Sequence, residues 1–449
     1  MTQDIAERHR PVTTAPTSGV AGDLADALVP FIGDLPVHLT AWDGSTAGPL
    51  DAPQVRLNSP NALRRLLWYP GELGAAQAYV TGEIDIEGSV ADALRHAWAV
   101  VAERGLTMRL SDPRAVLGLV QVARRHGAFG RRPKPPKTQI AVSGRLHSKG
   151  RDREVIHHHY DLSNDFYELI LDANMAYSSA YVTGSPLDGV ENADYSLEHA
   201  QRDKLDLVCR KIGLHERPGM TMLDVGCGWG SLSLHAAQHY GAKVTGVTIA
   251  AEQKAFIDKR IRDRGLEDLV TIELCDYRDV RGTYDAVASL EMGEHAGDKG
   301  YPDYTATLYR SAAPGARVLI QQMSRRGRHP GGGPFIEAFI APDMTMRPVG
   351  DTVALLEDAG LEVRDVHAMR EHYVWTVRGW QARFDAHRDE LTALVGDEVV
   401  RVWELYLAGG LLAFEQGRMG VDQILSVRRP SAPTGLPAVR PREWSDPRD

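Results

Sequence analysis

The pattern of apolar and polar positions divides the chain into two regions with different periodicities. Residues 21–128 carry apolar residues at helical spacing, such as Leu24 and Leu28, and they predict a small α+β domain. From 154 to 429, short apolar runs alternate with helix-compatible segments, an order typical of a parallel sheet with helices on both faces. The predicted strands are the runs TMLDVG, AKVTGVTI, LVTIELC, YDAVASL and ARVLIQQM.

Three segments lack this periodicity and are predicted to lie outside the two domains. Residues 1–20 are polar and residues 430–449 are rich in proline, so both are predicted to be disordered. Residues 129–153 contain several Pro and Gly and are predicted to be a basic linker. Ten Lys or Arg and two acidic residues fall within 124–154. This stretch is either a solvated linker or a contact with anionic lipid headgroups.

Composition and charge narrow the functional classes. The net charge of −9, and the lack of aromatic residues among the basic ones, disfavour a nucleic-acid-binding protein. The three cysteines form no CxxC pair, so neither a disulfide framework nor a metal site is expected. The first twenty residues resemble no signal peptide, and no apolar run approaches the roughly 20 residues of a membrane span. The sequence therefore predicts a cytoplasmic protein that meets any lipid substrate peripherally, at the inner face of the membrane.

The first strand of the second domain runs into a glycine-rich turn, LDVGCGWGS. Gly226, Gly228 and Gly230 separate the strand from a helix, and glycine allows a tight turn and a close approach to a ligand. Their spacing is not that of the dinucleotide fingerprint. With Asp224 at the strand end, the turn resembles motif I of class I methyltransferases. We therefore expect an α/β fold with a doubly wound, mainly parallel, Rossmann-like sheet that binds S-adenosylmethionine.

Polar residues after the next two strands extend the predicted cofactor site. Many adenosine-binding folds place a carboxylate after the second strand to hold the ribose, whereas this chain has Thr248 and Gln253. Asp276 and Tyr277 follow the third strand, where an acid can accept from the adenine amine and a ring can pack on the base. Ligands bind at the carboxyl ends of strands in such sheets, so these residues are expected to lie together.

The series of motifs resembles the cyclopropane-fatty-acid synthase family, which includes mycolic-acid cyclopropane synthases and mid-chain fatty-acid methyltransferases. HYDLSNDFYELIL, AYSSAY and the Glu-His-Ala-Gly at 294–297 carry the resemblance, and residues 71–88 resemble the N-terminal domain of phospholipid-acting members. The resemblance implies methyl transfer from S-adenosylmethionine to the double bond of an unsaturated, oleoyl-type phospholipid acyl chain. It also implies that Tyr177 and Ser178 contact the cofactor.

The resemblance further implies an anion site, and there this chain departs from the family. The resemblance implies that cyclopropane-forming members hold a bicarbonate with a Cys, a Glu, a His and a Tyr. Glu294 and Tyr373 match two of these residues, whereas Ser179 replaces the Cys and Gln321 replaces the His. Glu291 adds a carboxylate where the family has a small residue. A bound bicarbonate is therefore doubtful, and either Glu291 or Glu294 is the expected base.

These departures leave the product open. The favoured hypothesis is a hydride shift followed by proton loss from the added methyl, which gives a 10-methylene branch, and the alternative is a cyclopropane. A methyltransferase of small metabolites and a non-catalytic lipid-binding protein are more remote alternatives. The sequence also leaves open a homo-oligomer and a partner reductase that acts on the methylene product.

Overall fold

The structure is a computed structural model, and it describes residues 19–105, 113–140, 151, 164–327, 331–431 and 436–444. Residues 1–18, most of the second half of the predicted linker, and part of the predicted C-terminal tail lie outside these ranges. So do the first residues of the HYDLSNDFYELIL motif. Contacts divide the chain into two compact units. One comprises Met1–Gln139 with Gly396–Leu412, and the other comprises Ile140–Val395 with Ala413–Asp449.

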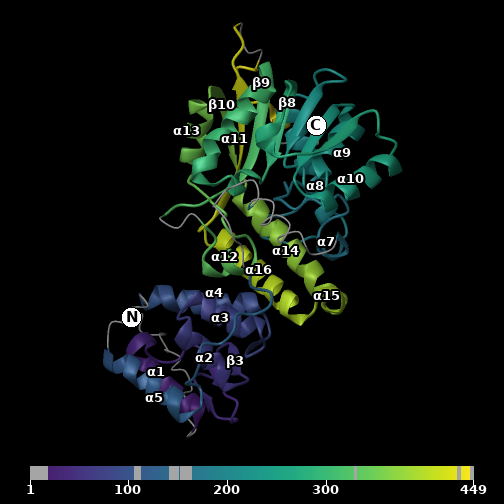
Figure 1. Cartoon of the computed structure of the whole chain (residues 1–449). Coiled ribbons are helices and arrows are strands. Elements are labelled where there is room, and N and C mark those ends of the chain that lie inside the picture. Colours follow the sequence, from purple (N-terminus) through teal and green to yellow (C-terminus); the bar gives the residue numbers. More distant parts are fainter. Residues whose placement is uncertain are drawn as a thin grey trace, which may run out of the picture. The chain divides into compact units, whose positions relative to one another are not determined.

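The N-terminal unit is α+β, as the sequence predicts. A four-stranded sheet in the order β2-β1-β3-β4 packs with helices around an apolar core (Figure 1). Ser59 and Ser89 each accept a hydrogen bond from a backbone N–H of the helix that follows, which explains where α2 and α4 begin. The elements are α1 (Val20–Ile32), β1 (His38–Thr40), β2 (Thr46–Ala47), β3 (Gln54–Leu57), α2 (Pro60–Trp68), α3 (Glu72–Val80), β4 (Ile84–Glu87), α4 (Val90–Glu103) and α5 (Pro113–Arg125).

The second unit contains a seven-stranded sheet in the order β10-β11-β9-β8-β5-β6-β7. The five predicted strands are β5 (Thr221–Val225), β6 (Lys243–Thr248), β7 (Val270–Leu274), β8 (Tyr284–Leu290) and β9 (Ala312–Ser324), and neighbours among them pair in parallel. The sequence analysis named neither β10 (Leu361–Ala368) nor β11 (Gly420–Arg428). Strand β11 is antiparallel to both of its neighbours, so the sheet is mainly parallel.

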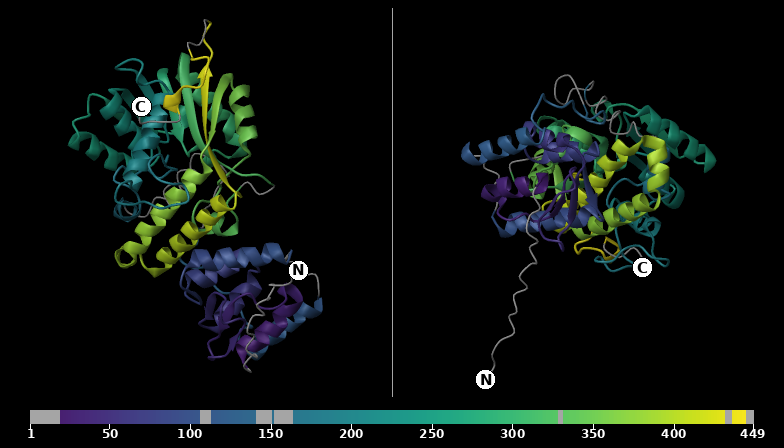
Figure 2. Two further views of the ribbon diagram at one scale, coloured as in Figure 1. Left: turned by 180° about the vertical axis from the view of Figure 1, so that it is seen from behind. Right: turned by 90° about the horizontal axis from the view of Figure 1, so that it is seen from below.

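Helices cover both faces of this sheet, as Figures 1 and 2 show. Alternate strand residues enter two separate cores, so Met222 faces one side and Leu223 the other. The first core includes α8 (Leu197–Lys211), α9 (Ser231–Tyr240) and α10 (Ala251–Asp263), and the second includes α11 (Gly297–Ser311) and α13 (Val349–Asp358). The remaining helices among the described residues of this part of the chain are α7 (Asn164–Ile170), η1 (Tyr277–Asp279), η2 (Gly293–His295), α12 (Pro334–Phe339), α14 (Arg370–Ala386), α15 (Arg388–Val395), α16 (Asp397–Glu415) and η3 (Arg442–Trp444).

Helix α16 is assigned to one domain by the sequence pattern and mostly to the other unit by its contacts in the structure. The pattern places this helix within the second domain, 154–429, whereas Gly396–Leu412, which contains most of the helix, clusters with the N-terminal unit. Ala408 is buried beside Tyr79, and Arg401 lies over the Tyr79 ring and pairs with Asp85. The helix therefore belongs with residues more than 300 positions earlier in the chain.

The first part of the predicted linker packs on the N-terminal unit. Trp68 Nε1 donates to the carbonyl of Gly130 at 3.0 Å, and Arg65 donates to the carbonyl of Lys134 at 2.9 Å. Four basic side chains of this segment remain exposed, namely Arg131, Arg132, Lys134 and Lys137. No helix among the described residues is both long and apolar enough to cross a membrane.

Candidate active site

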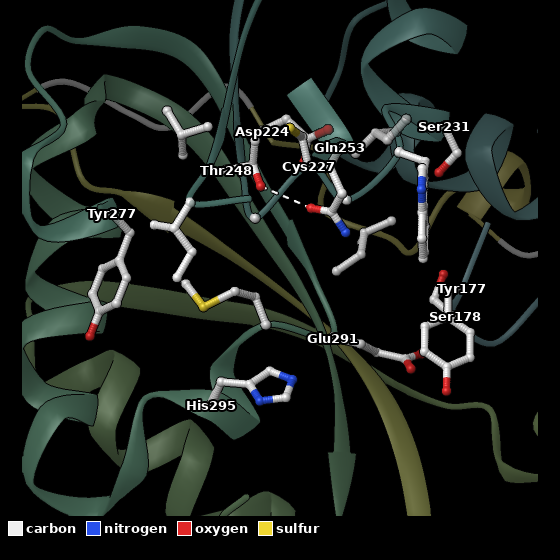
Figure 3. Close-up of a pocket in the computed structure, with 18 of the residues that line it drawn as sticks. Tyr177, Ser178, Asp224, Cys227, Ser231, Thr248, Gln253, Tyr277, Glu291 and His295 are labelled. Carbon is white, nitrogen blue, oxygen red and sulfur yellow. Dashed lines mark hydrogen bonds between the residues drawn. The ribbon is translucent and has the colours of Figure 1, made fainter. Parts of the chain in front are cut away.

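A cavity opens at the carboxyl ends of β5, β6, β7 and β8 (Figure 3). Nine of the ten residues expected to contact the cofactor line it: Tyr177, Ser178, Asp224, Gly226, Gly228, Thr248, Gln253, Asp276 and Tyr277. Gly230 does not line it. A Cβ at Gly230 would lie 2.9 Å from Ile257, so this glycine allows α9 to pack against α10.

The glycine turn keeps the floor of the cavity open. Gly226 and Gly228 have φ values of 76° and 54°, a region that side-chain-bearing residues rarely adopt. A Cβ at Gly226 would lie 2.6 Å from the side chain of Met292. One at Gly228 would meet no protein atom within 4 Å, so it would extend into free space beside the turn.

Two polar side chains on the cavity wall are held by their neighbours. Buried Asp224 accepts a hydrogen bond from Ser233 Oγ at 2.7 Å, and burial raises its pKa to about 6. Thr248 Oγ1 donates to Gln253 Oε1 at 2.9 Å (Figure 3). Gln253 Nε2 is buried and has no partner among the described residues. An amide donor at the cavity wall therefore remains available for a ligand oxygen.

The third strand contributes an acid that already has a protein partner. Arg278 donates from Nε to one carboxylate oxygen of Asp276 at 2.7 Å and from Nη2 to the other at 2.6 Å. The sequence analysis did not single out Arg278, although it directly follows the predicted Asp276 and Tyr277. This arginine fixes the orientation of the carboxylate beside the cavity.

Tyr177 and Trp229 form an aromatic wall of the cavity, and further buried rings pack around Tyr177. Tyr177 lies with its ring centroid 5.3 Å from that of Trp380 and 6.4 Å from that of Trp229. Tyr373 stacks on Phe414 at 4.4 Å and meets Trp380 edge-on at 5.9 Å. Neither tryptophan is among the residues that the sequence predicts for the site: Trp229 lies in the glycine turn, and Trp380 lies in α14, where a tryptophan is more often a core residue.

Glu291 lies at the centre of the residues that the sequence proposes as catalytic. Its Oε1 accepts from the backbone N–H of Ser179 and from Nε2 of Gln321, both at 2.8 Å, and its Oε2 accepts from the Tyr373 hydroxyl at 2.7 Å. The hydroxyl of Ser179 donates instead to the carbonyl of Ala180. The main chain of Ser179, rather than its side chain, thus contributes to this cluster.

A buried lysine adds positive charge near Glu291. Burial raises the pKa of Glu291, and the three hydrogen bonds and Lys204 oppose this increase. Lys204 on α8 is fully buried and donates to Ser178 Oγ at 2.7 Å. Its pKa is lowered to about 8 by burial, despite the carboxylates of Glu291, Asp172 and Asp224. Lys204 is not among the predicted site residues, because in sequence a buried lysine of a helix looks the same as a lysine on a solvent-exposed helix face.

Glu294 lies in a different environment from Glu291. It is fully buried, does not line the cavity, and accepts from the backbone N–H of Met323 at 2.6 Å. Burial and the neighbouring Glu291 raise its pKa to about 8. Glu294 is therefore largely protonated near neutral pH, which leaves Glu291 as the better candidate for an ionised base.

The family of the chain follows from a sequence match that spans the glycine turn and most of the second unit. The sequence pattern described as mycolic acid cyclopropane synthetase matches residues 147–424. The chain belongs to this family.

Relatives and a solved structure agree with this assignment. A probable fatty acid methyltransferase of Mycobacterium tuberculosis is 35% identical, over 92% of this chain and 96% of its own. Tuberculostearic acid methyltransferase of the same organism is 33% identical, over 88% of each chain. The solved structure of a Mycobacterium tuberculosis cyclopropane synthase has a TM-score of 0.57 and 26% identity, covering 63% of this chain and 100% of that one. These similarities confirm the predicted class I methyltransferase fold.

Proposed function

We propose that this member of the mycolic acid cyclopropane synthetase family methylates the double bond of an unsaturated fatty acyl chain in a membrane phospholipid. The chain is an S-adenosylmethionine-dependent methyltransferase acting on fatty acyl chains, in line with its family and the names of its relatives. The proposal about the product rests on the Glu291 carboxylate and the three hydrogen bonds that hold it.

The cavity suits S-adenosylmethionine, which supplies an electrophilic methyl group when it is bound. Gln253 Nε2 is an unpaired donor suited to a ribose oxygen, and the turn at Gly228 leaves room for close approach. Asp224 and Asp276 both line this cavity and offer carboxylate acceptors. We assign cofactor binding to these residues and to Tyr177, Ser178, Gly226, Thr248 and Tyr277, with Gly230 shaping the turn.

The aromatic wall suits the charge that develops on the acyl chain. An alkene is a weak nucleophile, so it must be held close to the methyl donor with water excluded. Its π electrons would form the new bond to the methyl as the methyl–sulfur bond breaks, with S-adenosylhomocysteine as the leaving group, and a cation would remain on the adjacent carbon. The rings of Tyr177 and Trp229, which line the cavity, can stabilise this cation, since aromatic rings attract positive charge in a dry site.

Glu291 is the proposed base. It receives hydrogen bonds from Ser179, Gln321 and Tyr373, positions matching those that, by resemblance, hold bicarbonate in cyclopropane-forming members. The protein's own carboxylate then replaces the bound anion. In the proposed reaction a hydride moves from the methyl-bearing carbon to the cationic one. Glu291 then accepts a proton from the new methyl, and the electron pair of the broken C–H bond forms the exocyclic double bond.

We further propose that the protein works at an anionic membrane surface. Arg131, Arg132, Lys134 and Lys137 are exposed on one short segment, and Phe129 beside them is 55% exposed. Basic residues near anionic lipid contribute about 1 kcal/mol each, and an exposed aromatic ring can enter the interface. Two further statements remain predictions: that the protein forms a homo-oligomer, and that a partner reductase acts on the methylene product.

Mass spectrometry of phospholipid acyl chains from a host supplied with oleate tests the proposal. The wild type should yield mainly a methylene-branched chain. Gly228→Val should yield none, because it fills the cofactor space and is strained at positive φ. A predominantly cyclopropane product would overturn the assignment of the product, and an unmodified oleoyl chain would overturn the assignment of the substrate.

A further inference from the structure

A row of polar side chains crosses three neighbouring strands of the sheet. His367 on β10 pairs in register with Gln423 on β11, and Gln423 pairs with Gln321 on β9. We call these three residues the polar row. The next strand, β8, ends at Leu290 opposite Gln321, so Glu291 directly follows the end of the row. Gln423 and Gln321 are essentially inaccessible to solvent.

Lys211, at the end of α8, meets this row from one side of the sheet. Its ammonium is fully buried and lies 3.0 Å from Gln423 Oε1, 3.1 Å from His367 Nδ1 and 3.5 Å from Asp365 Oδ2. An ammonium has three donors and no acceptor, so these three contacts use all of its hydrogens. Arg440 also pairs with Asp365, and burial lowers the pKa of His367 to about 3, which keeps the ring neutral and able to accept.

The donor at Lys211 sets the direction of the bonds from one end of the row, and at the other end Gln321 Nε2 also donates to the carbonyl of Ser179 at 3.2 Å, which favours the same orientation. Because Lys211 can only donate, the Gln423 amide must present its oxygen to it. Gln423 Nε2 then donates to Gln321 Oε1 at 3.0 Å, and Gln321 Nε2 donates to Glu291 at 2.8 Å. A neutral amide can otherwise turn over at little cost, since its oxygen and nitrogen have similar size.

We propose that Lys211 is a positioning residue that acts through Gln423 to hold the Gln321 amide with its N–H toward the Glu291 carboxylate. The inference rests on the proposed role of Glu291 as base. With Gln321 turned over, its oxygen would face the carboxylate, and two acceptors would meet in a buried site. The base would then lose a hydrogen bond that supports its ionised form.

Two substitutions at Gln423 separate this role from simple packing. Gln423→Glu keeps an acceptor, now charged, for Lys211. It forces Gln321 to turn its N–H toward position 423 and its oxygen toward Glu291. Gln423→Met removes the connection without reversing it. We expect kcat to fall about 100-fold for Gln423→Glu and about 10-fold for Gln423→Met, with little change in the affinity for S-adenosylhomocysteine.

A merely structural role predicts the opposite order, because Gln423→Glu satisfies Lys211 better than Gln423→Met does. That order, or losses of kcat that parallel losses of cofactor affinity, would overturn the inference. In a Gln321→Met background the difference between the two Gln423 substitutions should shrink, because no amide remains to be reversed. Ser426→Ala is the matched control, because Ser426 is a buried polar residue of β11 outside the polar row.

Lys211→Met directly tests the lysine at which this series of hydrogen bonds begins. It keeps the apolar stem and removes the cation, so kcat should fall about 10-fold while the affinity for S-adenosylhomocysteine holds. An unchanged kcat would contradict the proposal. If Glu291→Gln also leaves kcat unchanged, the proposed function itself fails. If Glu291→Gln abolishes turnover while the Lys211 and Gln423 variants retain it, only this inference fails.

Discussion

At the scale of single residues, the conformation of Glu291 indicates a functional constraint. Its φ of 52° lies in the left-handed region that glutamate rarely adopts. Such strain persists only where the surroundings compensate for it, and here three hydrogen bonds to the carboxylate provide that compensation. We infer that the backbone is held in this conformation so that the carboxylate reaches the donors of Ser179, Gln321 and Tyr373.

Two substitutions of Glu291 test whether its carboxylate replaces a bound anion. Glu291→Gln keeps the shape but cannot accept a proton, so kcat should fall at least about 100-fold, with or without bicarbonate. Glu291→Gly suits the positive φ and leaves the three donors facing an empty space. Its activity in bicarbonate-free buffer should be equally low and should rise when bicarbonate is added. Turnover is measured by methyl transfer to oleoyl phospholipid.

The Glu291→Gln variant serves as the control for the Glu291→Gly variant. Both remove the base, but only the glycine variant makes room for an external anion. Equal rescue of both variants by bicarbonate would mean that the anion acts elsewhere. A Glu291→Gln variant with wild-type kcat would exclude Glu291 as the base.

Glu294 should make stability depend on pH in a predictable direction. Its pKa in the folded protein is about 8, above the ordinary 4.5, so the folded state holds a proton that the unfolded state releases. The contribution of Glu294 to stability is therefore complete below pH 4.5 and is lost as the pH rises through 8. Relative to Glu294→Gln, the wild type should lose roughly 2–5 kcal/mol of unfolding free energy between pH 5 and pH 9. Urea denaturation across this range measures the difference, and a constant difference would contradict the assignment.

At the scale of elements, the segment that follows α5 should govern binding to membranes. Its basic residues are exposed while its backbone is held by Trp68 and Arg65, so charge can be removed without unfolding the segment. Replacing Arg131, Arg132, Lys134 and Lys137 together with Gln should weaken sedimentation with anionic vesicles. The defect should shrink as the salt concentration rises, because salt screens exposed charges.

A matched variant distinguishes a specific surface from net charge. Lys243, Lys259, Arg262 and Arg264 are exposed basic residues on the second unit, and replacing them with Gln removes the same amount of charge. Vesicle binding should be retained in that variant. Equal loss in both variants would show that overall charge, rather than the segment after α5, determines the attraction.

At the scale of the whole molecule, most of α16, although late in the sequence, packs with helices of the N-terminal unit. Ala408 is fully buried in a cluster with Tyr79, Val90 and Ala91. Ala408→Asp would bury an unpaired carboxylate there and should lower the free energy of unfolding by about 3 kcal/mol or more. Ala393→Asp, at an exposed position of α15, is the control and should change stability by less than about 0.5 kcal/mol. Thermal unfolding compares the two, and similar stabilities would argue against this packing.

Local sequence predicted much of the second unit. The strand-to-helix turn with Gly226 and Gly228 is identifiable because a tight turn and positive φ restrict which residues can occupy it. Five parallel strands were identifiable because strands buried on both faces read as short apolar runs. Strand β10 was not named, since its residues alternate between exposed and partly buried at the edge of the sheet.

Tertiary structure alone decided which polar residues meet. The resemblance grouped Ser179, Gln321 and Tyr373 in one anion site, and only the fold shows that all three donate to Glu291. These partners lie 112, 30 and 82 positions away along the chain, distances at which no periodicity constrains contact. The same holds for the ammonium of Lys211, which reaches Gln423 from 212 positions away. Sequence determines local conformation through sterics and periodicity, whereas the order of strands and the return of helices determine which distant side chains share a site.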